Sequence, residues 1–190
     1  MEVRQATVAD AAEILAFVRA KAEFDRELGA FTGDLGTTEE LIGRHLFGPR
    51  PFAFALLAGE PGQAVGFALY YFRYSSFRGR PSVWLDDLYV HSPARRQGAG
   101  HLLMRRLAEL AVMADCTHIA WIASASNKVG MSFYKRIGAT VVHQAGDTVT
   151  LQIEPDRLLA TIGSHGLLGT PMKDTGCRER DDSQSMHKGE

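Results

Sequence analysis

The first fifty residues combine one short strand with two amphipathic helices. Val3–Ala6 is predicted as a strand, and Thr7 followed by Asp10 is a capping-box signature for a helix start. Apolar residues three and four apart predict a helix to about Glu27 and a shorter one that begins after Thr38. These positions are Ile14, Leu15, Val18 and Ala22 in the first helix, and Leu41, Ile42 and Leu46 in the second.

Three strands follow, and their spacing predicts an antiparallel meander. Phe52–Ala58 and Val65–Tyr74 are rich in apolar and aromatic residues, and a turn containing Gly and Pro separates them. Val83–Val90, with the sequence VWLDDLYV, is the third strand. Because charged residues are depleted in strands, its adjacent Asp86 and Asp87 are the first candidates for chemistry.

The C-terminal half alternates helices and strands. Gly98–Ala114 has leucines on one face, and Asn127–Ile137 ends before Gly138, which suits a left-handed position after a helix. Further strands are predicted at 118–123, 140–143 and 148–153, and a last helix at 155–162. The strand–helix–strand order implies a parallel crossover. The predicted fold class is therefore mixed α/β, a mostly antiparallel sheet of about six to seven strands with helices on both faces.

Composition divides the chain near Gly163. Residues 164–190 hold few apolar side chains and many charged ones, so they cannot bury enough surface to offset their ordering entropy. We predict one domain at residues 1–163 and a polar, disordered tail at 164–190. The formal net charge of the chain is -1, which argues against a general nucleic-acid-binding protein.

Other features bear on the compartment and on metals. The two cysteines, Cys116 and Cys177, do not form a disulfide framework, which favours a reducing cytoplasm. No apolar run approaches the ~20 residues of a membrane span, and the first residues lack the pattern of a signal peptide. The seven histidines show no metal-ligand spacing, so no metal site is expected.

The segment Arg95–Gly100, with the sequence RRQGAG, lies between a predicted strand and a predicted helix. Glycines let the backbone approach a ligand closely, and the free N–H groups of a helix N-terminus favour an anion. Arg95 and Arg96 add positive charge, so this loop is predicted to bind a pyrophosphate. It lacks the third glycine of a dinucleotide fingerprint, and the chain has no Walker loop.

This hexad resembles the acetyl-CoA motif R-x-x-G-x-G of the GNAT superfamily of N-acetyltransferases. The resemblance covers about residues 3–162 and is closest to the diamine (spermidine/spermine) acetyltransferase branch. It is carried by VGFALYYFRYSSFRG at 65–79, WLDDLYV at 84–90, RRQGAG at 95–100 and SFYKRIGA at 132–139. It implies acetyl-CoA as cosubstrate, a small amine as acceptor, and a homodimer. Because Cys116 has no His or Asp motif around it, we expect direct transfer in a ternary complex rather than an acyl-cysteine intermediate.

The resemblance also implies a set of cofactor-binding residues. They are the strand backbone at Leu88, Tyr89 and Val90, the loop residues Arg95, Arg96, Gln97, Gly98, Ala99 and Gly100, and Asn127 and Tyr134 of the next helix. Tyr134 takes the position of the general acid, because a phenol can donate a proton to the departing thiolate. A half-buried structural tyrosine is the alternative for Tyr134, and helix capping explains Asn127 nearly as well.

The acceptor amine must lose a proton before it attacks, since a primary amine has a pKa near ~10. By resemblance, Asp86 is the base, and Asp87 helps to bind the cationic acceptor. Strand alternation points neighbouring side chains to opposite faces unless a bulge intervenes, as the resemblance suggests here. Asp25 is also expected to meet the acceptor, and a solvated helix face is an equal alternative for it.

Departures from the diamine branch concern the acceptor. The branch usually has Glu-Asp where this chain has Asp86-Asp87, it often has Trp in the region of residues 147–150, and residues 29–40 match poorly. The acceptor could therefore be a polyamine or diamine, or another amine such as an amino acid, an antibiotic or a protein N-terminus. A non-catalytic acyl-CoA-binding module is the alternative from another class.

Overall fold

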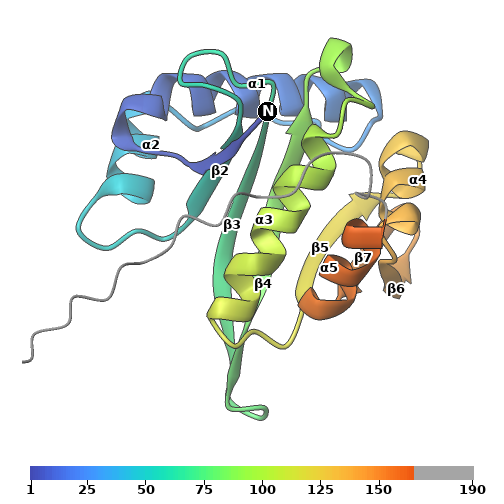
Figure 1. The fold of residues 1–190 in the computed structure, drawn as a ribbon. Coiled ribbons are helices and arrows are strands. Elements are labelled where there is room, and N and C mark those ends of the chain that lie inside the picture. Colours follow the sequence, from blue (N-terminus) through green and yellow to red (C-terminus); the bar gives the residue numbers. More distant parts are fainter. Residues whose placement is uncertain (165–190) are drawn as a thin grey trace, which may run out of the picture.

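A computed structural model describes residues 1–164, in which seven strands form one sheet of order β1-β2-β3-β4-β5-β7-β6 (Figure 1). The strands are β1 (Val3–Gln5), β2 (Phe54–Ala58), β3 (Gly66–Ser75), β4 (Arg80–Val90), β5 (Ile119–Ser124), β6 (Thr140–Ala145) and β7 (Thr148–Ile153). The helices are α1 (Ala11–Glu27), α2 (Glu39–Phe47), α3 (Ala99–Met113), α4 (Lys128–Arg136) and α5 (Pro155–Ser164). The tail predicted at 164–190 lies, after its first residue, outside the described part of the chain.

Strand pairing follows the predicted class. β1 to β4 form an antiparallel meander, and β7 inserts antiparallel between β5 and β6. Only β4 and β5 are parallel, and α3 connects them, so the predicted crossover is confirmed. Within residues 1–164, no helix is both long enough and apolar enough to cross a membrane.

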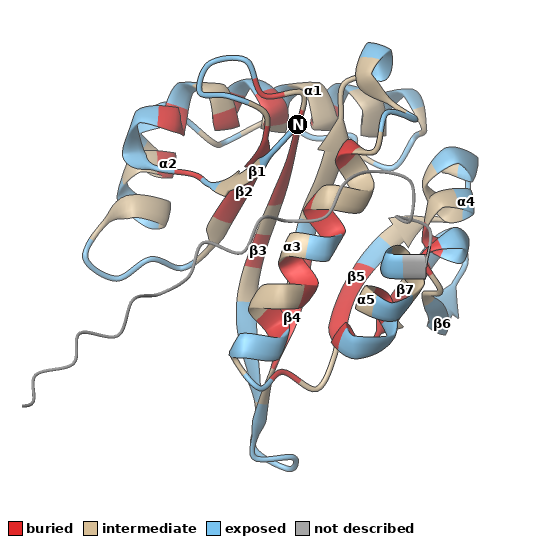
Figure 2. Cartoon of the chain, in the orientation of Figure 1, coloured by how far each residue is buried: buried red, intermediate tan, exposed pale blue. Residues whose placement is uncertain are grey.

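Each face of the sheet carries its own apolar core, which confirms helices on both faces. On one face, Phe17 of α1 and Ile42 of α2 pack with Leu57 and Phe67 of the sheet. On the other face, α3 and α5 contribute buried residues to a larger cluster with β4, β5 and β7. Figure 1 shows α3 lying across this face, and Figure 2 shows buried residues along β3, β4 and β5 and on α3.

A buried acid fixes the start of α1. Asp10 is 4% exposed, and its carboxylate accepts hydrogen bonds from the Arg4 guanidinium at 2.8 and 2.7 Å and from the Thr7 N–H at 2.7 Å. The predicted capping box is therefore present, and the same carboxylate ties α1 to β1. The hydrogen bonds from Arg4 hold the pKa of Asp10 well below its usual range.

The substitution Asp10→Ala is expected to lower the free energy of unfolding by about 3 kcal/mol, because it removes both short hydrogen bonds of the half-buried Arg4 guanidinium and leaves only the Glu13 carboxylate, 3.9 Å away. Urea unfolding at pH 7 measures the change, and Asp34→Ala at an exposed position should cost less than about 0.5 kcal/mol. Because the folded pKa of Asp10 is depressed, its contribution is present above the unfolded value near ~3.9 and is lost as pH falls toward the folded value. Equal stability of the two variants would contradict this role.

Candidate active site

The site begins where β4 and β5 separate. Their parallel pairing is limited to Val83 with Ile119 and Trp84 with Ala120. β4 then continues to Val90 while β5 runs on beside β7, and the two strands diverge (Figure 1). Beyond Trp84, this edge of β4 has no strand partner among residues 1–164.

The free edge of β4 presents backbone groups to the opening. The His91 N–H donates to the Val65 carbonyl at 2.9 Å, on the side of β3. The N–H and C=O of one strand residue point to the same edge, and successive residues alternate between the two edges. The N–H and C=O groups of Leu88 and Val90 therefore face the side from which β5 has departed. The Val90 carbonyl there accepts a hydrogen bond from Arg95 Nε at 3.0 Å. The remaining amide groups can bind an extended ligand as a neighbouring strand would.

A pocket of about 180 Å³ fills this opening, between β4, β5, α1 and the start of α4. Five of its lining residues were predicted from the sequence: Asp25, Asp86, Leu88, Asn127 and Tyr134. Lys21 and Ser124 also line it and were not predicted. The structure thus brings an acid pair, an ammonium and a phenol to one opening in the sheet.

A β-bulge presents Asp86 to this pocket. Leu85 pairs with Tyr70 and Asp87 pairs with Leu69, so Asp86 is the extra residue without a partner on β3. The predicted break in alternation is confirmed. Asp86 is exposed and lines both this pocket and a second one of about 420 Å³ between α1, α2 and β4.

Asp87 lines the second pocket rather than the first. Its Oδ1 lies 3.7 Å from Lys21 Nζ, and the same ammonium contacts the carboxylate of Asp25. Burial raises the pKa of Asp87 to about 6; the Lys21 charge opposes this shift, and the charges of Asp86 and Asp25 add to it. Asp87 is therefore a carboxylate that is ionised at neutral pH and titrates just below it.

Tyr134 of α4 lies at the inner end of the opening. It is 8% exposed, and its ring lies 5.0 Å from that of Trp121. Burial, together with the negative charges of Asp25 and Asp87, raises the pKa of its phenol. The hydroxyl therefore stays protonated across the neutral range, which is the form that a general acid needs.

Asn127 caps α4. Its Oδ1 accepts a hydrogen bond from the Gly130 N–H at 2.8 Å, so the capping alternative is confirmed. A side chain at Gly130 would collide with the Asn127 amide, because an added Cβ would lie 2.6 Å from it. The cap and the close glycine together fix the start of α4 beside the pocket. They thereby help to position Tyr134, which lies further along the same helix.

The predicted phosphate loop is built around unusual backbone conformations. Gly98 is the N-cap of α3 with φ of 92°, and Arg96 has φ of 65°. Both angles fall in the left-handed region, which Gly98 adopts at no steric cost. Ala99 is buried, and an added Cβ at Gly100 would lie 3.4 Å from the Phe133 ring. The first N–H groups of a helix have no partner within the helix, so those at the start of α3 are the groups of this loop that could receive an anion.

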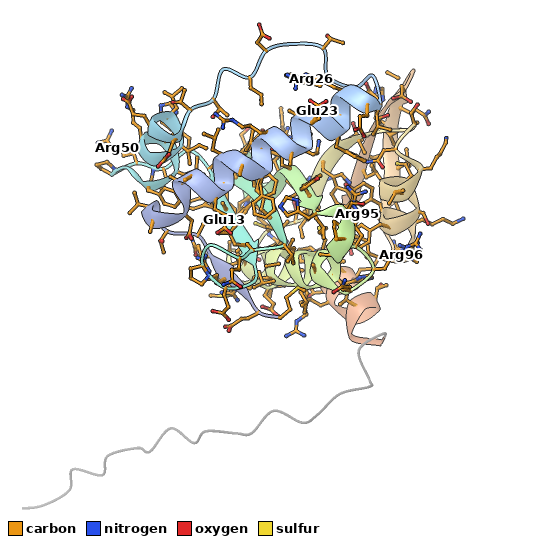
Figure 3. All side chains as sticks on the ribbon, turned by 90° about the horizontal axis from the view of Figure 1, so that it is seen from above. Glu13, Glu23, Arg26, Arg50, Arg95 and Arg96 are labelled. Atoms are coloured by element: carbon orange, nitrogen blue, oxygen red, sulfur yellow. The ribbon has the colours of Figure 1, made fainter. Side chains whose placement is uncertain are left out.

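The two arginines of this loop have different surroundings. The Arg95 guanidinium lies 5.1 Å from the centre of the Phe24 ring and 5.7 Å from that of Tyr89, so it also binds the loop to α1. Arg96 is exposed, and Figure 3 labels both arginines in the loop beside α1. Gln97 donates to the Pro93 carbonyl at 3.0 Å and stabilises the turn. Arg96 is thus the arginine whose side chain is open to solvent and to a bound anion.

Asp147, in the turn between β6 and β7, is a further residue of the site that was not predicted from the sequence. It accepts hydrogen bonds from the hydroxyl of Ser124 and from the N–H and hydroxyl of Ser126, the last two at 2.9 and 2.8 Å. The hydrogen bond from Ser124 contributes most to lowering the pKa of Asp147. These bonds fix the segment between β5 and α4, which forms one wall of the pocket.

Cys116 and a metal site were the other possibilities for chemistry, and neither is found at the pocket in the described part of the chain. Cys116 is buried in the larger apolar core, where burial raises the pKa of its thiol, and it does not line the pocket. Residues 1–164 contain no group of three or more His, Cys, Asp or Glu side chains that could hold a metal ion.

Comparisons with known proteins agree with this geometry. A model of the acetyltransferase (GNAT) family matches residues 13–139. The thialysine N-epsilon-acetyltransferase of Bos taurus is 32% identical over 151 residues, which are 75% of this chain and 86% of that protein. The spermidine/spermine N(1)-acetyltransferase-like protein 1 of Homo sapiens is 30% identical over 145 residues, or 73% of this chain and 20% of that protein.

A solved structure shares the fold. The PaiA N-acetyltransferase of Thermoplasma acidophilum, in complex with coenzyme A, superposes with a TM-score of 0.60 over 80% of this chain and 98% of that one, at 14% identity. With the family match over most of the sheet and site, these findings show that this chain belongs to the acetyltransferase (GNAT) family, whose enzymes transfer the acetyl group of acetyl-CoA to an amine.

Proposed function

We propose that the acceptor is a primary amine of a small polyamine- or diamine-like molecule, acetylated by direct attack in a ternary complex. The observation that carries this proposal is the acid cluster of Asp25, Asp86 and Asp87 beside the phenol of Tyr134. Such a cluster attracts an ammonium, and a second cationic group on the same molecule gains from the remaining carboxylates. The names of the bovine and human relatives also describe acetyl transfer to amines of small molecules.

The chain offers acetyl-CoA a series of matching groups. The amides at the start of α3 and the Arg96 side chain are placed to receive the pyrophosphate, and the free edge of β4 at Leu88 and Val90 to receive the pantetheine arm. The same edge can polarise the thioester carbonyl through an amide N–H. The cofactor supplies the acetyl thioester, and the surrounding residues orient it toward the acid cluster.

Asp86 is proposed to accept the proton of the acceptor ammonium, directly or through water. It lines the pocket that also contains Tyr134, whereas Asp87 lies in the second pocket and holds the cation. The freed amine attacks the thioester carbon, so a C–N bond forms and the C–S bond breaks. Tyr134 donates its proton to the departing sulfur, and the second proton lost by the acylated nitrogen, directly or through water, restores the phenol. Cys116 lies outside the pocket, which supports direct transfer rather than an acyl-cysteine intermediate.

Substituting Tyr134→Phe should lower kcat about 100-fold, because it removes the proton donor and keeps the packed ring. The KM for acetyl-CoA should change little. Thiol release with spermidine as acceptor measures both constants. Tyr74→Phe, on an exposed ring of β3, is the matched control and should behave as the wild type. An unchanged kcat in Tyr134→Phe would exclude the general-acid role.

Substitutions of the two adjacent aspartates should affect different kinetic constants. Asp86→Asn is expected to lower kcat about 100-fold by removing the base, and Asp87→Asn to raise mainly the KM for the amine. Since the pKa of Asp87 is about 6, its carboxylate loses its charge as pH falls below 6, so the wild-type KM for the amine should rise there. This rise should be absent in Asp87→Asn. If Asp87→Asn instead lowers kcat and Asp86→Asn does not, the base is Asp87.

We also propose, from the resemblance, that the chain forms a homodimer and works in the cytoplasm. The edge strand β6 is exposed along its whole length and carries Val141 and Val142 at 52% and 50% exposure. Exposed apolar side chains on an edge strand support a partner there. Sedimentation of the full chain should give twice the mass of one chain, and a monomer would contradict the proposal.

A further inference from the structure

Lys21 stands where the proposed function places the acceptor's ammonium. Its Nζ contacts the carboxylate of Asp25 on the next turn of α1 and lies 3.7 Å from Asp87 on β4. Lys21 is the one Lys or Arg side chain among the pocket's lining residues in the described part of the chain. An acceptor ammonium held by Asp25 and Asp87 would need the position that this side chain occupies.

The ion pairs of Lys21 are of a kind that a ligand can exchange. The side chains of Lys21, Asp25 and Asp87 are 22%, 25% and 21% exposed, so water and solutes reach all three. Lysine carries a compact charge on a flexible four-carbon stem, and a partly exposed pair gains little free energy from one fixed geometry. The Lys21 side chain can therefore leave the two carboxylates without unfolding α1.

We propose that Lys21 is a tethered cation that occupies the acceptor's ammonium subsite between Asp25 and Asp87, and that an acceptor must displace it to bind. The inference rests on the proposed function, because it assigns that subsite to the acceptor. A tethered competitor acts at a fixed, high effective concentration. Lys21 therefore weakens the binding of every cationic acceptor and admits only those with enough positive charge to replace it.

A different role for Lys21 makes an opposite prediction. An ammonium in the acceptor pocket could bind a carboxylate of the acceptor instead of competing with its amine. Lysine and cadaverine separate the two roles, because they differ only in the carboxylate. Competition predicts that removing the Lys21 charge improves both acceptors, whereas carboxylate binding predicts that it weakens lysine and leaves cadaverine unchanged.

The test compares Lys21→Met with the wild type at pH 8, using acetyl-CoA and either cadaverine or lysine. Met keeps the length of the side chain without its charge. We expect the KM for each acceptor to fall about threefold to tenfold, with kcat changing less than KM. Lys21→Arg keeps a cation and should stay within about twofold of the wild-type KM. Arg19→Met makes the same charge change at an exposed position of α1 and should leave the KM unchanged.

Calorimetric binding of cadaverine without acetyl-CoA gives a readout that does not depend on turnover. Tighter binding to Lys21→Met than to the wild type supports the tethered cation even if no amine is acetylated, an outcome that would remove the proposed function alone. An unchanged or raised KM and Kd for cadaverine in Lys21→Met would overturn the inference. A raised value for lysine alone would also overturn it, in favour of carboxylate binding.

Discussion

The divergence of β4 and β5 is the constraint on which the rest of the site depends. β4 is paired with β3 from Arg80 to Val90 apart from the bulge residue Asp86, and β5 is paired with β7 from Ile119 to Ser124. On their facing edges, β4 and β5 share two pairs of residues, Val83 with Ile119 and Trp84 with Ala120. The bulge at Asp86 lies just beyond the second pair, and bulges bend a strand and increase its local twist. The opening beyond these pairs leaves polar backbone groups at Leu88 and Val90 for a ligand.

The same opening determines the electrostatics of the site. At the bulge, Asp86 lines both pockets and Asp87 lines the second one, so two adjacent residues supply an exposed carboxylate and a more buried one. The two carboxylates differ in burial, and burial of Asp87 raises its pKa to about 6. Burial of Tyr134, to which the charges of Asp25 and Asp87 add, raises the pKa of its phenol, so the phenol keeps its proton. A proton acceptor and a proton donor can thus coexist in one small pocket without neutralising one another.

The elements of this fold were largely predictable from local pattern. Amphipathic spacing, the caps at Thr7, Thr38 and Asn127, and the glycine at 138 predicted the helices, and the structure confirms them. The motif around Arg95–Gly100 and the Tyr134 segment led to the family, because both are short and contiguous in sequence. That Asp86 lines both pockets and Asp87 only the second was not predictable, since it depends on the pairing register with β3.

Asp147 and Lys21 were not predicted either, because their contacts also depend on how distant segments of the chain pack together. Asp147 is distant in sequence from Ser124 and Ser126, and only the pairing of β5 with β7 brings the turn to them. Lys21 sits within a run of charges on α1 that read as a solvated helix face. The feature that distinguishes Lys21 is its contact with Asp87, which is distant in sequence and lies on β4.

The position of Lys21 also bears on how an acceptor is chosen. Family likeness identifies the reaction, because the cofactor side of the site is built from backbone edges and a helix N-terminus that many sequences can form. The acceptor side is a balance between three carboxylates and one ammonium, and exchanging one side chain changes that balance. Asp25 and Asp87 would attract any amine, but with Lys21 between them they favour one that brings more positive charge than it must displace. On this proposal, the choice of acceptor depends less on the fold than on Lys21, the one Lys or Arg side chain that lines this pocket among residues 1–164.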